Sequence, residues 1–282
     1  MRRRKVEETV LKGLMIASLG LVLASLAGIL LVVIHRGISS LSLAMIFKVP
    51  EGGYYLGQGG GIANAIVGSI LLAFGACLLS SLVGLPIAFA LQREYLGPRL
   101  ARITRLSLDI LWGTPSIVYG AFGFVVMVYF GLTASLLAGV LTLSLLMLPI
   151  MTRSIEEIVR MMPQELKETS YALGATRIET TLAVTYRQAL PGIVTGVLLA
   201  FGRGIGDTAS ILFTAGYTDY LPRSLLDPVA SLPLAVFFQI ATPIPEVQQR
   251  AYAAALILLV IVLVVSLGSR LIGRRYSRNV IK

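Results

Sequence analysis

The feature that most constrains this chain is a series of long apolar runs with almost no charged residues. A helix needs about 20 apolar residues to cross the roughly 30 Å hydrocarbon core of a bilayer. Only 13% of the 282 residues are charged, whereas a soluble domain carries roughly 25%. We therefore predict an all-α integral membrane protein, organised as one transmembrane domain over residues 1–282. The six predicted transmembrane helices lie at about residues 14–35, 64–91, 111–130, 132–152, 189–216 and 251–272.

The net charge of +10 comes from basic residues that gather in alternate connections. Most Lys and Arg residues lie in segments 1–13, 92–110, 153–188 and 270–282, whereas the opposite connections hold Arg36, Lys48, Arg223 and Arg250. An excess of Lys and Arg marks the cytoplasmic side of a membrane protein. We therefore predict that both termini are cytoplasmic. The positive charge reflects this topology and indicates no nucleic-acid partner.

The residues that enzymes use for chemistry are scarce. The chain has one cysteine and one histidine, so no intrachain disulfide and no His/Cys metal site is expected. No lysine follows a glycine, which excludes the Gly-Lys-Ser/Thr loop that holds nucleotide phosphates. We predict no catalytic residue, no metal site and no cofactor bound by this chain.

The connection at about 153–188 carries ordered helix signals. Pro163 suits the first turn of a helix, and Glu165 and Glu168 place negative charge near its N-terminus. Gly174 is a typical helix stop, and Thr176 with Glu179 forms a capping-box pattern that starts a second helix. A plain solvated loop is the alternative. The ordered signals favour a helix, a glycine bend and a second helix that together form a docking element.

The fifth predicted span contains a charged residue near its middle. Arg203 lies within Gly202-Arg203-Gly204-Ile205-Gly206-Asp207-Thr208, and a charge at the bilayer centre costs about 2.5–3.5 kcal/mol on insertion scales. Asp207 follows four residues later, so the two side chains can pair on one helix face. They could simply neutralise each other or brace a partner subunit. On the functional interpretation, Arg203, Asp207 and Thr208 line a polar waist past which an oxyanion moves, since a guanidinium matches such ions with several donors.

Two groups of motifs resemble a known family. Glu168-Thr-Ser-Tyr-Ala-Leu-Gly174, followed by Ala189-Leu-Pro191-Gly192, resembles the EAA loop of ABC importer permeases. Thr169-Ser170 stands where the family usually has Ala-Ala, and Tyr186-Arg187 where it often has Leu-Pro. The resemblance implies a coupling helix that inserts into a groove of a partner ATPase. The residues it assigns to coupling are Glu165, Glu168, Tyr171, Ala172, Gly174 and Ala175.

The resemblance is more specific over other segments. Residues 202–209, 212–215, 60–69 and 114–120 are similar to the A-type membrane subunits of phosphate ABC importers, and the likeness runs over most of the chain. Asp207 stands where that family usually has Glu, which keeps the charge but shortens the side chain.

This resemblance implies a type I ABC importer permease that forms half of a phosphate pathway in the inner membrane of a prokaryote. The expected partners are a second homologous permease in a heteromeric pair, two ATPase subunits that use ATP and Mg, an extracytoplasmic phosphate-binding protein, and membrane lipid. A permease for another oxyanion (molybdate, sulfate or a phosphonate) is an alternative. A stand-alone secondary transporter is another, but it predicts internal repeats that we do not find. A membrane scaffold without transport would leave Arg203 unexplained.

Overall fold

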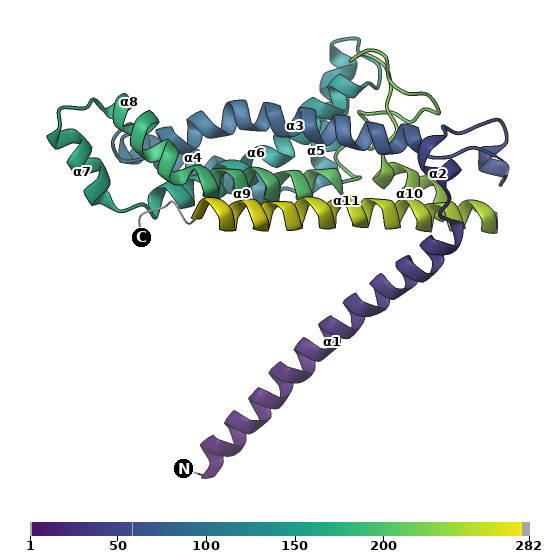
Figure 1. Ribbon diagram of the computed structural model, residues 1–282, viewed down its shortest axis with the longest axis horizontal. Helices are drawn as coiled ribbons and strands as arrows, with labels where there is room; N and C mark the ends of the chain where they lie inside the picture. The colour runs from purple at the N-terminus through teal and green to yellow at the C-terminus, as the bar shows by residue number, and fades with distance from the viewer. Residues whose placement is uncertain (1, 58, 278–282) are drawn as a thin grey trace.

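The structure, a computed structural model, describes residues 2–57 and 59–277 and is built from helices (Figure 1). An isolated antiparallel bridge pairs Pro50 with Gly60 ahead of α3. In chain order the elements are α1 (Arg2–Ser40), α2 (Leu43–Phe47), the 3-10 turn η1 (Tyr54–Leu56), α3 (Ala63–Ala90), α4 (Pro98–Gly113), α5 (Ser116–Tyr129), α6 (Leu136–Arg160), α7 (Gln164–Ala172), α8 (Arg177–Glu179), the π-helix η2 (Thr180–Thr185), α9 (Tyr186–Ile205), α10 (Leu232–Ile240) and α11 (Pro245–Ser277).

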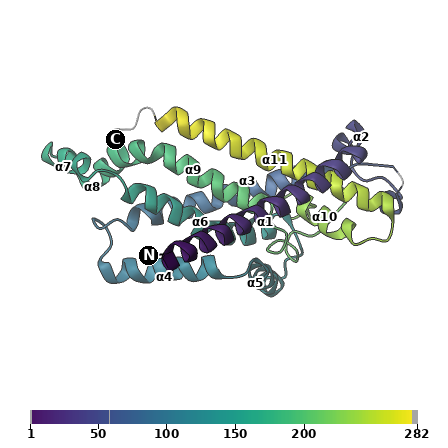
Figure 2. The ribbon, with the colours of Figure 1, turned by 90° about the horizontal axis from the view of Figure 1, so that it is seen from below.

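The described helices confirm the predicted all-α membrane fold. Five helical stretches are long and apolar enough to cross a bilayer, and the bent pair α4 and α5 would make a sixth span. The start of α1 and the end of α11 lie toward the end of the molecule that carries α7 and α8 (Figures 1 and 2). Both described chain ends therefore lie toward the same end of the helix bundle.

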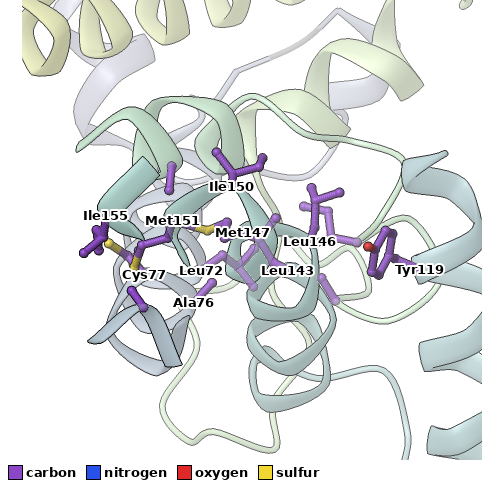
Figure 3. Close-up of a cluster of buried hydrophobic side chains, with 14 of the residues drawn as sticks. Leu72, Ala76, Cys77, Tyr119, Leu143, Leu146, Met147, Ile150, Met151 and Ile155 are labelled. Carbon is purple, nitrogen blue, oxygen red and sulfur yellow. The ribbon is translucent and has the colours of Figure 1, made fainter. Parts of the chain in front are cut away.

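The centre of the bundle is formed by α3, α6 and α9. Leu72, Ala76 and Cys77 of α3 pack against Met147 and Met151 of α6 (Figure 3). Cys77 is a buried apolar residue, as its position in the second span suggests. Small residues bring the backbones close, because an added Cβ on Gly84 would lie 2.8 Å from Thr152 Oγ1.

α1 leaves this bundle at an angle (Figure 1). The rest of the described chain does not bury the part of α1 that is long and apolar enough to cross a membrane. The C-terminal end of α1 contacts α11, where Arg36 Nη1 donates to Tyr252 OH at 3.3 Å and Gly37 packs against Leu256. α1 (2–40) and α11 (245–277) both extend beyond the predicted spans 14–35 and 251–272.

The predicted third span, 111–130, is wrong as a continuous helix. α4 ends at Gly113, α5 begins at Ser116, and their axes are bent by 100°. Pro115 has no N–H to donate and disfavours the helical conformation at Thr114, which is extended. The Tyr119 hydroxyl donates to the Leu111 carbonyl oxygen at 2.6 Å across the bend. Hydropathy alone did not indicate this break, because the residues on both sides are apolar.

The predicted fifth span, 189–216, is wrong at both ends. A continuous helical run starts with α8 at Arg177 and stops at Ile205. Because α6 also continues to Arg160, the predicted loop 153–188 is reduced to residues 161–176, with α7 inside it. The apolar segment Leu232–Ile240, which is too short to cross a membrane, forms α10 and packs against α3 and α11.

Candidate functional site

The break at the end of α9 lies at mid-depth in the bundle. An added Cβ on Gly204 would lie 2.5 Å from Met147 Sδ, and Met147 is halfway along α6. From Asp207 to Gly216 the chain forms turns instead of helix and continues toward the start of α6, where Ser135 N donates to Thr214 O at 2.9 Å. Non-helical backbone at membrane depth is tolerated where protein buries it or where it lines a water-filled cavity. Such breaks are where transporters commonly place their substrates.

Arg203 and Asp207 form the predicted ion pair at this break. Arg203 Nη1 donates to Asp207 Oδ1 at 3.0 Å, and Asp207 Oδ2 accepts from Ser210 N at 2.8 Å. The Asp207 side chain is 4% exposed, whereas that of Arg203 is 50% exposed. The carboxylate is thus a buried anchor that fixes one edge of a guanidinium whose other edge faces outward. Arg203 also lies in the last turn of α9, where the helix dipole favours a cation.

Thr208 lies on a different surface of the same turn. It borders a pocket of about 370 Å³ that apolar residues of α1, α10 and α11 line, together with Gly206. In the described chain no hydrogen bond joins Thr208 to Arg203 or Asp207. The structure therefore brings Arg203 and Asp207 together and leaves Thr208 beside them without a shared contact.

Two glycines of α5 allow the non-helical segment to approach this helix closely. An added Cβ on Gly120 would lie 2.6 Å from Ala209 O, and one on Gly123 would lie 3.1 Å from Thr214 Cγ2. Ser210 is fully buried, and its Oγ has no hydrogen-bond partner among the described residues. Ser210 was not predicted as a site residue. Ser210 is buried here only because α9 ends at Ile205, and the sequence pattern did not indicate that end.

The predicted docking element projects from the end of the bundle as α7 and α8 (Figure 1). Gly174 joins them in the left-handed region at φ +84°, and the predicted capping box is complete, with Thr176 and Glu179 each accepting from the other's backbone N–H. Leu173 is 85% exposed, a large apolar side chain at the tip. The other residues that we predicted here are exposed or half-buried: Glu165, Glu168, Ala172 and Gly174 are exposed, and Tyr171 and Ala175 are half-buried.

The projecting element is anchored to the connection between α3 and α4. Lys167 Nζ lies 3.0 Å from Glu94 Oε1, Arg177 Nη1 donates to Glu94 O at 2.7 Å, and the Tyr95 hydroxyl donates to Arg177 O at 2.8 Å. Burial raises the pKa of the Tyr171 hydroxyl, and the negative charge of Glu94 raises it further. These contacts give α7 a fixed position relative to the membrane helices. Movement of α7 can therefore be transmitted to α3 and α4.

An ion-pair network around the buried Glu156, between α4 and α6, was also not predicted. Glu156 is 4% exposed and accepts from Arg105 Nε at 2.6 Å and from Arg153 Nη1 at 3.0 Å. Arg153 Nη2 also contacts Asp109 Oδ1 at 2.6 Å. Arg153 and Glu156 are three residues apart, but Arg105 comes from another helix, so spacing alone could not indicate the network. Within the described residues, no group of three or more His, Cys, Asp or Glu side chains is placed to hold a metal ion.

The fold and these two elements define a multi-pass membrane protein with a broken helix at mid-depth and a projecting helical element at one end. Residues 80–278 match the family model of the binding-protein-dependent transport system inner membrane component. The solved inward-facing MetNI methionine ABC transporter has a similar fold, with a TM-score of 0.64 and 18% identity over 76% of this chain and 95% of that one.

Relatives with higher identity come from bacteria and an archaeon. The phosphate transport system permease protein PstA of Yersinia pestis is 35% identical, covering 86% of this chain and 82% of its own. PstA 1 of Mycobacterium tuberculosis H37Rv is 34% identical over 96% and 88% of the two chains. The probable PstA of Methanocaldococcus jannaschii is 38% identical over 73% of each. The chain therefore belongs to the binding-protein-dependent inner membrane components, and within them to the PstA-type permease proteins.

Proposed function

We propose that this chain is the transmembrane permease subunit of an ATP-driven phosphate importer and forms half of the translocation pathway. Its relatives at 34–38% identity are named phosphate transport system permease proteins. The structural observation that carries the proposal is the half-exposed guanidinium of Arg203, anchored by the buried Asp207 where α9 breaks at mid-depth. A fixed, permanently charged group with several N–H donors suits a tetrahedral oxyanion.

The proposed roles of the predicted pathway residues follow from their positions. Arg203 contacts phosphate as it passes, and Asp207 holds the guanidinium in place. Thr208 is the weaker candidate, because it borders the apolar pocket beside α1, α10 and α11. Phosphate needs only transient contact here, since a site that bound it tightly would slow its release.

The proposed coupling element is α7 with its glycine bend. Glu165, Glu168, Tyr171, Ala172, Gly174 and Ala175 form the surface that docks on a partner ATPase, with Leu173 as its apolar centre. ATP and Mg bind to that ATPase, and this chain contributes no catalytic residue. The anchoring of α7 to Glu94 and Tyr95 supports this role, because it connects the docking surface to the membrane helices.

The proposed assembly contains a second, homologous permease in a heteromeric pair, two ATPase subunits and an extracytoplasmic phosphate-binding protein. We place the second permease against α1, which lies apart from the bundle and has an apolar surface that this chain leaves uncovered. The basic end that carries α7 faces the cytoplasm. The complex is then located in the inner membrane of a prokaryotic cell.

Uptake by the reconstituted complex tests the substrate. Proteoliposomes that contain this chain, its permease and ATPase partners and the binding protein should take up radiolabelled phosphate only with ATP on the ATPase side. A tenfold excess of sulfate or molybdate should reduce the uptake by less than about twofold. Competition by either ion as strong as that by unlabelled phosphate would contradict the phosphate assignment and support the alternative oxyanion.

A further inference from the structure

Two neighbouring cavities lie between α4 and α6 at the end of the molecule that carries α7. They have volumes of about 750 and 300 Å³, and Leu91, Arg93 and Arg105 line both. Arg102 and Arg153 complete the basic lining of the larger cavity, whose single acidic residue is Asp109. Four arginines and one acidic residue give the lining of the larger cavity an excess of positive charge, which favours an anion.

Two of these arginines are already neutralised and held in place. Arg105 and Arg153 both contact Glu156, and Arg153 also contacts Asp109. Arg105 Nη2 donates further to Leu91 O at 2.9 Å. Their guanidinium planes are therefore fixed at the cavity wall before any ligand arrives, which lowers the entropy cost of binding.

The other two arginines supply uncompensated charge. Arg93 and Arg102 are exposed, and neither forms an ion pair in the part of the chain that the structure describes. Both line the larger cavity, Arg93 from the connection before α4 and Arg102 from α4 itself. The cavity thus has an excess of positive charge that would suit a ligand with one or two negative charges.

The cavity borders an apolar surface. Leu106 lines the cavity and is exposed, and Leu100, Ile103 and Ile110 continue the same exposed face of α4. Arg102 and Asp109 lie on the neighbouring face, toward the cavity. A ligand with a charged group in the cavity could therefore extend apolar chains along α4.

We propose that this cavity is a binding site for a phosphate group, contacted by Arg93 and Arg102 and backed by Arg105 and Arg153. The charge matches a phosphodiester or inorganic phosphate, and arginine forks bind such oxygens with paired N–H donors. The source is either the headgroup of an anionic phospholipid or free phosphate at the inner end of the pathway. The free-phosphate source rests on the proposed function, whereas the lipid source does not.

The test uses the whole transporter complex in nanodiscs and a matched pair of variants. Arg93→Gln/Arg102→Gln removes the two uncompensated charges of the cavity. Arg99→Gln/Arg187→Gln removes two exposed arginines that line neither cavity. One arm counts retained phosphatidylglycerol by native mass spectrometry after exchange into phosphatidylcholine. The other arm measures equilibrium binding of radiolabelled phosphate without ATP, with Arg203→Gln in every sample to remove the mid-depth site.

We expect the cavity variant to lose at least about tenfold in affinity in one arm, since each arginine near a membrane surface contributes roughly fivefold. The control variant should stay within twofold. Loss in the lipid arm identifies the headgroup, and loss in the phosphate arm identifies the free ion. Arg93→Lys/Arg102→Lys keeps the positive charge but not the paired donors, so its binding should fall between that of the unmodified complex and that of the Gln variant.

Equal binding by the cavity and control variants in both arms would overturn the proposal. The proposed function fails independently, through absent phosphate uptake by the unmodified complex. That failure would leave the lipid arm unaffected.

Discussion

At the scale of single residues, Arg203 and Asp207 act as a unit. The carboxylate is buried and also accepts from Ser210 N, so it stabilises the turn that follows α9 as well as the guanidinium. A buried charge that loses its partner is destabilising. The pair therefore has a structural role that exists alongside any role in transport.

We predict that Arg203 and Asp207 are energetically coupled. Asp207→Ala should reduce the stability of the complex by about 1–2 kcal/mol, because a charged hydrogen bond to the backbone and the ion pair are lost. The double variant Arg203→Gln/Asp207→Ala should cost less than the sum of the two single variants. A double-mutant cycle from thermal unfolding in detergent measures this difference. Additive losses would show that the 3.0 Å contact contributes nothing.

We also predict that Glu156 stabilises the contact between α4 and α6. Glu156→Gln leaves Arg105 and Arg153 facing each other without the carboxylate between them. We expect a loss of about 2 kcal/mol, below the 3–5 kcal/mol of a fully buried pair, because both arginines are partly exposed to solvent. Glu157→Gln changes an exposed neighbour and is the control. A thermal midpoint equal for the two variants would contradict the role of the network.

At the scale of elements, two breaks in the helices determine how the chain is arranged within the bundle. Pro115 separates α4 from α5, and the turn after Ile205 ends α9 at mid-depth. α7 and α8 depend on a third device, the left-handed conformation of Gly174 between them. Each break changes the direction of the chain, and the break after α9 is the one that carries Arg203 and Asp207.

We predict that Gly174→Ala weakens coupling. No atom lies within 4 Å of an added Cβ, so the cost of about 1 kcal/mol arises from the positive φ alone. Phosphate-stimulated ATPase activity of the complex should fall several-fold, because the angle between α7 and α8 changes. Gly97→Ala, also with open space but with φ −62°, is the control. Equal activities in the two variants would contradict the requirement for this bend.

Much of this element-scale structure could be predicted from the sequence, and the remainder has physical reasons. The Thr176–Glu179 capping box and the Arg203–Asp207 spacing are local signals, and both contacts are present. The end of α9 was missed because the apolar run Ile211–Phe213 follows it and suggested that the span continued. The Arg105–Glu156 pair joins residues 51 positions apart, and the Lys167–Glu94 pair joins residues 73 apart, so only the folded chain brings them together.

At the scale of the whole molecule, the proposed function requires that α7 face the cytoplasm. The α7 end carries the basic connections, and the opposite end carries η1, α10 and the segment between α9 and α10 (Figures 1 and 2). The only cysteine, Cys77, is buried, which makes the chain suitable for single-cysteine labelling.

We predict opposite accessibility of the two ends in a Cys77→Ala background. Leu173→Cys should react with a membrane-impermeant maleimide only in inverted vesicles that lack the ATPase. Tyr220→Cys, in the segment before α10, should react only in intact spheroplasts. Both native side chains are highly exposed, so access is limited by the membrane alone. The reverse pattern would contradict the cytoplasmic position of α7.

Phosphate uptake by proteoliposomes that carry Arg203→Gln tests whether Arg203 contacts the transported ion. We predict at least about a hundredfold loss of ATP-dependent uptake with the complex still assembled, because the neutral amide cannot match the charge of the oxyanion. Arg223→Gln, which removes an exposed arginine outside the pathway, should keep most of the uptake. Uptake by Arg203→Gln within a few fold of the unmodified complex would contradict the proposed role of Arg203 and reduce it to a structural charge.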